Sequence, residues 1–389
     1  MLHLGNKLQT DDLQFGFKGE IGCNNAIFVL NQTINHFNKL GSSVYGAALD
    51  FKKAFDRVHH LKLFKSLMDA KLPKYFISLL CNWYAKMFVS VKWNGTFSKS
   101  FQVRSGVRQG SSLSPGIFNL FVDTFIKEIK LNDTGCKINN KFVGIIMYAD
   151  DLIILSASVQ GLQSMLDCCT RMSYHTNLNF NVKKCLCFVV GPTYNDIMPA
   201  MLLCSESITW SKCFKYLGVN FVCNKTLQLD VNVIKRKFYA SCNAVICNSG
   251  SADEIVKLSL CESFCIPLLV YGVPFCNLNR AILQELNVCW NSVMRRIFGF
   301  HRWESIRDFI SNLGRMDFIH IRMLHFIKFC KFGLQSRNDI FKSSIRKFLS
   351  SSECRDIFCL ENASEVNFVL GLSAPKLKRM IMCKYRAKL

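Results

Sequence analysis

The sequence lacks a long uninterrupted apolar run, which argues against a membrane-spanning protein. Its most apolar window, residues 264–275, is too short to cross a bilayer and contains two prolines. Residues 1–7 also lack the apolar core of a secretory signal peptide. We therefore expect an intracellular protein, nuclear, cytoplasmic or both, that is neither secreted nor associated with a membrane.

Acidic residues are scarce in this chain. There are 27 Asp and Glu residues against 49 Lys and Arg residues, so the formal net charge is +22. An excess this large indicates a polyanionic partner, most often nucleic acid. A basic surface that serves only solubility remains the alternative, and the total charge cannot choose between DNA and RNA.

The cysteines lack the arrangement of either a disulfide framework or a zinc finger. The chain has 20 cysteines but no secretory signal, so a disulfide-stabilised fold is not expected. Pairs such as Cys242 with Cys247, and Cys261 with Cys265, do not combine into a zinc-finger spacing. We interpret the cysteines as reduced and mostly buried thiols that pack as small apolar side chains.

What the chain does have is enough apolar sequence for a large core. Half of its 389 residues are hydrophobic, which predicts two or more subdomains. Up to residue 228, short apolar strands alternate with amphipathic helices, so we predict an α+β unit. The expected strands are residues 44–49 and 185–190, and the expected hairpins turn at residues 94–95, at residues 150–151, and between residues 208–210 and 214–219.

Beyond residue 229 the strand signals fade and helical periodicity takes over. Helices are expected at residues 230–248, 253–264, 280–299, 303–313 and 317–336. Basic side chains recur on them, namely Lys235, Arg236, Lys237, Arg295, Arg296, Arg315 and Arg322. The predicted domains are therefore residues 1–228, a helical region at 229–300, and a basic helical extension at 301–389.

The stretch around Asp150 and Asp151 is the most informative in the chain. Two adjacent carboxylates repel each other by roughly 1 to 4 kcal/mol, depending on the local dielectric, unless a cation lies between them. The flanking apolar runs, residues 143–146 and 152–155, predict a hairpin that holds both acids at its tight turn. Their oxygens could ligate a divalent metal there. A plain turn, in which one Asp makes local hydrogen bonds, is the alternative.

A third acid, Asp50, follows the expected strand at residues 44–49. Strands this far apart in sequence can pair in one sheet, which would bring Asp50 to Asp150 and Asp151. Clustered acids raise each other's pKa and cost stability unless cations compensate them. Two Mg²⁺ ions held by carboxylates are what nucleotidyl transfer uses. The acids therefore predict a two-metal site, with Mn²⁺ as the alternative ion.

Five ordered motifs within residues 13–222 resemble those of a reverse transcriptase palm. They are residues 49–58 (LDFKKAFDRV), 108–115 (RQGSSLSP), 148–151 (YADD), 181–184 (NVKK) and 216–218 (YLG). The first is similar in particular to the LINE-type (non-LTR) retrotransposon polymerases. The resemblance implies a right-hand polymerase: a palm of antiparallel sheet with packed helices and partial fingers in residues 1–228, then an all-α thumb and a helical C-terminal region.

The resemblance also implies a role for each motif residue. Asp50, Asp150 and Asp151 would hold the metals, with the backbone carbonyl of Phe51 as a further ligand. Phe55 would lie under the incoming sugar and exclude a 2′-hydroxyl, which favours deoxynucleotides; core packing is the alternative. The other implied contacts are Lys184 to the leaving pyrophosphate, Arg108, Gln109, Gly110 and Tyr148 around the nucleotide, and Tyr216, Leu217 and Gly218 in a primer grip. For Lys184 the alternative is a plain surface charge.

The implied reaction is RNA-templated addition of deoxynucleotides from dNTPs to a DNA primer. Two features depart from the family pattern. Ser111 stands where related elements commonly have a glycine, and only twelve residues precede Leu13, whereas the family's fingers extend further upstream. We therefore expect an N-terminally incomplete part of a longer polyprotein. The rival interpretations are an inactive, nucleic-acid-binding retrotransposon remnant and another palm polymerase, such as an intron maturase or an RNA-dependent RNA polymerase. Phe55 argues against ribonucleotide use.

Overall fold

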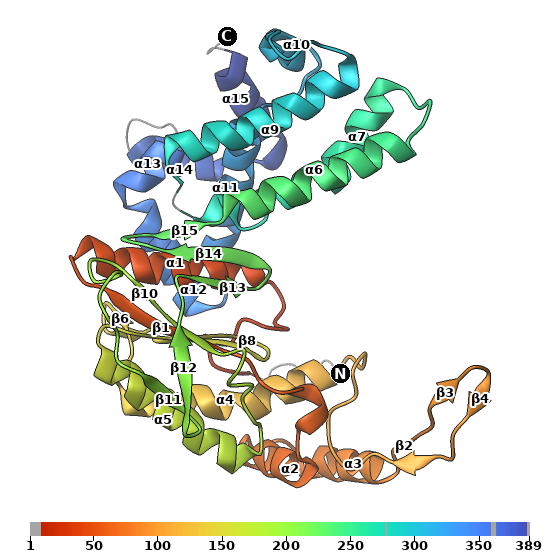
Figure 1. The fold of residues 1–389 in the computed structure, drawn as a ribbon, viewed down its shortest axis with the longest axis vertical. Helices are drawn as coiled ribbons and strands as arrows, with labels where there is room; N and C mark the ends of the chain where they lie inside the picture. Colours follow the sequence, from red (N-terminus) through yellow and green to blue (C-terminus); the bar gives the residue numbers. More distant parts are fainter. Residues whose placement is uncertain (1–8, 277, 359–362, 387–389) are drawn as a thin grey trace. The chain divides into compact units, whose positions relative to one another are not determined.

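The computed structural model describes residues 9–276, 278–358 and 363–386 (Figure 1). The chain forms two compact units. The first comprises Met1–Ala26, Thr33–Phe214 and Cys223–Thr226, and the second comprises Ile27–Gln32, Lys215–Val222 and Leu227–Leu389. The three-part division at residues 228 and 300 stays a prediction.

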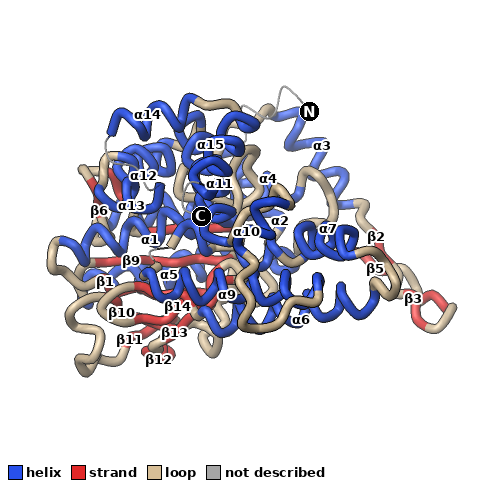
Figure 2. The backbone as a smooth tube through the Cα atoms, turned by 90° about the horizontal axis from the view of Figure 1, so that it is seen from above, coloured by secondary structure: helices blue, strands red, loops and turns tan. Residues whose placement is uncertain are grey.

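A six-stranded sheet forms the centre of the first unit. Its strand order is β11-β12-β10-β1-β9-β8, with β1 antiparallel to both β10 and β9. Figure 2 shows β9, β1, β10, β11 and β12 of this sheet in red. The bounds are β1 (Val44–Leu49), β8 (Ile145–Tyr148), β9 (Asp151–Ser156), β10 (Leu186–Val190), β11 (Met201–Leu203) and β12 (Glu206–Trp210). Strands β8 and β9 are almost entirely buried, as their apolar sequences require. The predicted strands and the Asp150–Asp151 hairpin are confirmed.

Helices cover this sheet. In the first unit α4 (Ser114–Asn132) packs against α5 (Val159–Thr176), and α5 lies against β1 and β9. Helix α5 begins where the Ser158 hydroxyl accepts a hydrogen bond from the Gly161 amide at 3.0 Å. The other helices that include residues of this unit are α1 (Cys23–Lys39), η1 (Phe55–Arg57), α2 (His60–Asp69) and α3 (Lys74–Ala85).

A thin hairpin extends from the first unit after α3. Strands β3 (Lys92–Trp93) and β4 (Thr96–Phe97) pair across a turn in which Asn94 and Gly95 have φ angles of 45° and 82°. Positive φ at both central residues is what a type I′ hairpin turn requires, so the predicted turn is confirmed. At its base β2 (Phe88–Val89) pairs with β5 (Phe101–Gln102), and a separate small hairpin joins β6 (Lys137–Ile138) to β7 (Lys141–Phe142).

The hairpin predicted between residues 208–210 and 214–219 is wrong. Strand β12 pairs with β11 across a turn at Cys204 and Ser205, and with β10 in parallel on its other side. Both edges of β12 are therefore occupied before the chain reaches residue 213. The next strand instead joins a separate three-stranded sheet of β13 (Cys213–Tyr216), β14 (Val219–Cys223) and β15 (Leu227–Leu229).

From Val231 onward the described residues of the second unit are helical, as predicted. Its helices are α6 (Val231–Asn248), α7 (Glu254–Phe264), α8 (Ile266–Val270), η2 (Val273–Phe275), α9 (Arg280–Phe298), α10 (Arg307–Asn312), α11 (Phe318–Gln335), α12 (Asp339–Leu349), α13 (Ser352–Phe358), α14 (Ala363–Gly371) and α15 (Ala374–Arg386). Side chains of Asp230, Asp253 and Asp317 cap α6, α7 and α11. The α+β fold class, with a largely antiparallel sheet, packed helices and a following helical region, is confirmed.

Several basic residues predicted on the helical faces are engaged within the fold. Arg322 is only 4% exposed, and the Arg315 guanidinium contacts Glu262 at 2.9 Å. Lys235 forms an ion pair with Glu285. A surface for nucleic acid on this unit therefore excludes Arg322, because a buried guanidinium cannot reach a phosphate.

One stretch, Glu254–Phe275, is long and apolar enough by composition to cross a membrane. This stretch includes the apolar window at residues 264–275 and also the residues of α7 that precede it. In the structure it comprises α7, α8 and η2, and 56% of its most apolar part is buried inside the folded chain. This burial is what core helices of a folded domain show, so the stretch is weak support for a membrane span.

Candidate active site

Strand pairing brings Asp50 and Asp151 to the same end of the sheet. Leu49 lies opposite Leu152 in the β1–β9 register, so Asp50 follows β1 beside the first residue of β9, Asp151. Asp150 lies on the turn that joins β8 to β9, where Tyr148 pairs with Asp151. The sequence prediction that the three acids meet at one sheet end therefore agrees with the strand geometry.

The electrostatics of Asp150 reflect this setting. Burial raises the pKa of the Asp150 carboxyl, and the nearby charge of Asp50 raises it further, while a hydrogen bond to its own backbone opposes both. Asp150 is thus poised to gain from a cation. Among the described residues, the three carboxylates do not form a close three-ligand cluster of the kind that three cysteines form elsewhere in the chain. Carboxylate oxygens are the ligands that Mg²⁺ prefers, so this donor set fits a divalent ion.

The segment that carries Lys184 is fixed to Asp50 through the backbone. The Asn181 amide donates to the Asp50 carbonyl at 2.7 Å, and the Lys184 ammonium lies 4.0 Å from Asp50 Oδ2. The Phe51 ring stacks on Phe180 with centroids 4.4 Å apart and is buried. Phe51 can therefore offer only its backbone to the site, as the resemblance implies.

Phe55 lies in an aromatic stack at the edge of the site. Its ring stacks on Phe118 with centroids 4.2 Å apart and meets Phe17 edge-on at 6.1 Å. The Val107 amide donates to the Phe55 carbonyl at 2.8 Å, and Gln109 Nε2 donates to Asp56 Oδ1 at 3.1 Å. The structure therefore brings the predicted nucleotide-contacting segments together, with Arg108, Gln109 and Gly110 exposed to solvent.

The remaining predicted residues divide between the two units. Tyr148 is half-buried in the first unit, and burial together with a hydrogen bond to Cys23 raises the pKa of its hydroxyl to about 12. Tyr216, Leu217 and Gly218 belong to the second unit rather than to the unit that carries the carboxylates. There the Leu217 carbonyl accepts a hydrogen bond from the Tyr271 hydroxyl at 2.7 Å.

Sequence reasoning missed the residue that holds the Asp150 turn in place. Gln14 is fully buried, and its Oε1 accepts hydrogen bonds from the Ala149 amide at 3.0 Å and from the Gly16 amide at 2.9 Å. The Phe15 amide also donates to the Met147 carbonyl at 2.7 Å. Ala149 has a φ of 56°, a conformation that L-residues seldom adopt unless their surroundings hold it. Gln14 supplies such support.

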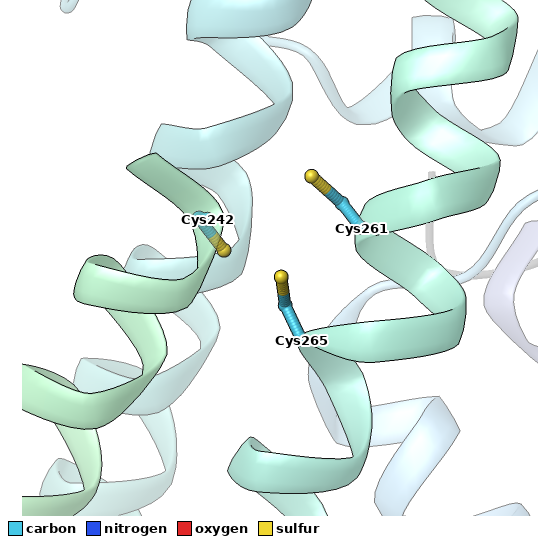
Figure 3. Close-up of side chains that lie close together, drawn as sticks. All are labelled: Cys242, Cys261 and Cys265. Atoms are coloured by element: carbon cyan, nitrogen blue, oxygen red, sulfur yellow. The ribbon is translucent and has the colours of Figure 1, made fainter. Parts of the chain in front are cut away.

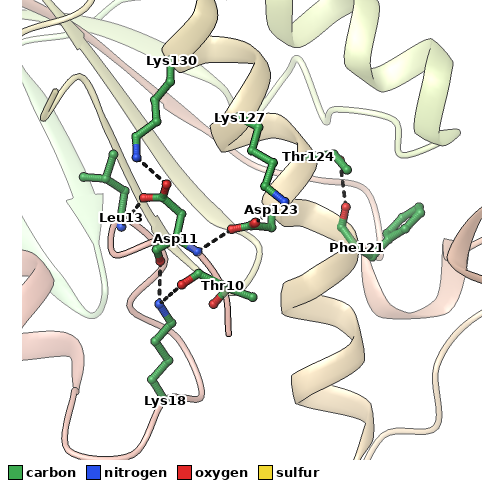
Figure 4. Close-up of polar contacts among 9 residues, drawn as sticks. All are labelled: Thr10, Asp11, Leu13, Lys18, Phe121, Asp123, Thr124, Lys127 and Lys130. Atoms are coloured by element: carbon green, nitrogen blue, oxygen red, sulfur yellow. Dashed lines mark hydrogen bonds and ion pairs between the residues drawn. The ribbon is translucent and has the colours of Figure 1, made fainter. Parts of the chain in front are cut away.

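The loop that carries Gln14 is anchored to α4 by charged side chains (Figure 4). The Asp11 amide donates to Asp123 Oδ1 at 2.8 Å, and the Asp11 carboxylate forms an ion pair with Lys130. Lys18 donates to the carbonyl of Thr10 at 3.0 Å, and burial lowers the pKa of its ammonium group. Residues 10–18 are therefore an ordered support of the site, although residues 13–19 of the sequence indicate only a loop that contains glycine and aromatic residues.

Comparison with known proteins adds to this geometry. A family model described as reverse transcriptase (RNA-dependent DNA polymerase) matches residues 6–221. The Pol polyprotein of a type-2 retrotransposable element from Drosophila melanogaster is 29% identical over 228 residues, which cover 56% of this chain and 21% of that protein. The RNA-directed DNA polymerase of the mobile element jockey, also from Drosophila melanogaster, is 24% identical over 306 residues, or 76% of this chain and 33% of that protein.

Among solved structures, telomerase from Candida albicans in complex with a fragment of telomeric RNA aligns with a TM-score of 0.48. The alignment has 12% identity and covers 95% of this chain and 56% of that chain. The chain thus spans about a fifth to a third of the length of the two curated relatives above.

Proposed function

The chain belongs to the reverse transcriptase (RNA-dependent DNA polymerase) family, and from that premise we propose that it is the RNA-directed DNA polymerase of a non-LTR retrotransposon. The observation that carries the proposal is the placement of Asp50 and Asp151 at the same end of paired strands, with Asp150 on the adjoining turn. Its partners would be an RNA template, a DNA primer and dNTPs inside the cell.

In this proposal Asp50, Asp150 and Asp151 hold two Mg²⁺ ions. Bound divalent cations would neutralise the phosphates and lower the pKa of the attacking primer hydroxyl. The partial burial of Asp150 strengthens its attraction for a cation, because desolvated charges interact more strongly than exposed ones. The exposed basic residues of the second unit, Arg236 and Lys237 among them, would hold the nucleic-acid backbone as a thumb.

Primer extension tests the proposal directly. The purified chain, supplied with a DNA primer annealed to an RNA template, should add deoxynucleotides only when Mg²⁺ or Mn²⁺ is present. Binding of the same primer–template without extension, in either ion, would instead support the inactive remnant and overturn the proposal.

Lys184 is predicted to act on the leaving group. Its ammonium lies 4.0 Å from Asp50 Oδ2 and is largely exposed, so it is free to approach a bound pyrophosphate. Replacing Lys184 with glutamine should lower the rate of single-nucleotide addition by about 10²-fold, the usual size of a general-acid contribution. Rapid-quench measurement of one addition, at saturating dNTP, reports this rate.

The neighbouring Lys183 is the matched control, because it is also exposed and carries the same charge. Lys183→Gln should leave the addition rate close to that of the unmodified chain. Equal losses in both variants would show that Lys184 acts only through general positive charge.

Phe55 is predicted to select the sugar. Replacing it with valine should raise incorporation of NTPs relative to dNTPs by about tenfold or more, because a smaller side chain removes a steric barrier to the 2′-hydroxyl. The ratio of kcat/KM for dGTP and GTP opposite cytosine in an RNA template measures this change.

Phe97→Val, on the exposed β4 strand, is the control and should not alter the ratio. If the unmodified chain already prefers NTPs, the RNA-polymerase interpretation gains support. If Phe55→Val leaves the preference for dNTPs intact, Phe55 serves only to pack against Phe118.

A further inference from the structure

Three cysteines whose spacing along the sequence does not match a zinc finger lie close together in the second unit (Figure 3). Cys242 comes from α6, Cys261 from α7, and Cys265 from the junction of α7 with α8. Their sulfur atoms all lie within 4.8 Å of one another, and each side chain is 0–1% exposed. The sequence analysis interprets these thiols only as buried packing residues. That interpretation is incomplete, because the pairing of the helices brings three sulfur atoms together that are far apart in the sequence.

We propose that Cys242, Cys261 and Cys265 form a binding site for a thiophilic metal ion, Zn²⁺, with their three thiolates as its ligands. Zinc binds cysteine sulfur at about 2.3 Å, so sulfurs that share one tetrahedral ion lie roughly 3.8 Å apart. The observed cluster reaches that spacing with only small side-chain movements. In Figure 3 the three side chains point toward a common space between the helices.

The donor set suits zinc in kind as well as in spacing. Soft thiolate ligands select zinc and copper(I) over magnesium or calcium. A tetrahedral ion needs a fourth ligand, and the Ser241 hydroxyl lies 3.3 Å from Cys265 Sγ, where it or one water molecule could complete the shell. Binding is not a redox step: three thiols lose three protons, Zn²⁺ takes the three thiolates, and the product carries one negative charge.

A bound ion would also connect two elements of the second unit. Since Cys242 lies on α6 and the other two on or after α7, a bound ion would fasten the two helices to each other.

The test uses the whole chain, reduced with a non-thiol reagent and stripped of metal by a chelator. Titration with Co²⁺ should produce thiolate-to-cobalt charge-transfer absorption that saturates at one ion per chain, and Zn²⁺ should displace it. Cys242→Ala and Cys265→Ala should weaken Co²⁺ binding by at least about 100-fold, because each removes a direct ligand. Cys330→Ala is the matched control, since Cys330 is equally buried in α11 of the same unit, and it should bind Co²⁺ as the unmodified chain does.

A second measurement needs no variant and so does not depend on how the variants fold. Zn²⁺ should slow alkylation of Cys242, Cys261 and Cys265 at least about tenfold more than alkylation of Cys330, as mapped by mass spectrometry of the peptides. No cobalt–thiolate absorption, or equal zinc protection of Cys330 and the three cluster cysteines, would overturn the proposal.

Discussion

Replacement of Asp150 with asparagine is expected to lower Mg²⁺-dependent primer extension by about 10³- to 10⁴-fold. The change keeps the size of the side chain and removes one charge. A metal that stabilises transition-state charge contributes several kcal/mol, and each 1.36 kcal/mol corresponds to about a tenfold change in rate. Asp150 lies on the turn between β8 and β9, and the charge of Asp50 acts on its carboxyl group there.

Binding should survive this substitution. Affinity for the primer–template arises mainly from contacts between basic side chains and phosphates, and removing an acid does not weaken those contacts. Fluorescence anisotropy with a labelled primer–template measures the Kd, and single-turnover extension measures the rate. The expected result is a large loss of rate with a Kd that changes by less than about threefold.

Asp196→Asn provides the matched control, because Asp196 is an exposed acid of the same unit that lies in the loop after β10. It should extend primers at the rate of the unmodified chain. If Asp150→Asn extends primers at a comparable rate, Asp150 does not hold a metal ion needed for extension. The proposed two-metal site then loses one of its three carboxylates.

The sequence could predict the sheet and its acids because both depend on local patterns. Asp50 directly follows an apolar strand, and Asp150 and Asp151 lie between two more, so each position is visible within about ten residues. The turn at Asn94 and Gly95 was equally visible, since those residue types favour the positive φ that a hairpin turn needs. Helix starts at Asp230, Asp253 and Asp317 follow the same local logic.

What the sequence could not predict depends on contacts between distant segments. Strand β12 does not pair with the strand that begins at Cys213, because β10 and β11 already occupy both of its edges. No local sequence pattern reveals these pairings. The burial of Arg322 depends likewise on how the helices of the second unit pack. The Cys242 cluster depends on the pairing of α6 with α7, and motif spacing along the chain carries no trace of it.

Gln14 is the most consequential omission, since a glutamine in a predicted loop gives no signal of burial. Its importance follows only from its hydrogen bonds to the Ala149 backbone. The sequence also gives no sign of the role of Gly16. Its lack of a side chain leaves room for the backbone of the Tyr148–Ala149 turn. A Cβ atom on Gly16 would lie 2.4 Å from the Ala149 nitrogen and 3.1 Å from the Ala149 Cα. Both atoms belong to the backbone, so no change of rotamer can relieve the contact.

Replacement of Gly16 with alanine is therefore expected to damage the proposed site, although Gly16 contributes none of its three carboxylates. The added methyl must push either the loop or the Tyr148–Ala149 turn aside, at a cost of roughly 1–3 kcal/mol in the free energy of unfolding. Because Asp150 is the next residue along the turn, its carboxylate should move with it. A displacement of about 1 Å at a reacting centre can lower a rate by about 10²-fold. Thermal unfolding and single-turnover extension, measured on the same preparation, report the two effects.

Gly19→Ala separates this steric effect from a general loss of loop flexibility. Gly19 lies three residues further along the same loop, and within the described part of the chain no atom comes within 4 Å of a Cβ built there. Neither glycine requires a positive φ, so alanine is conformationally acceptable at both positions. Gly19→Ala should keep full stability and activity. If the two variants behave alike, the close approach of Gly16 to the turn does not position Asp150, and the support of the site must rest on Gln14 instead.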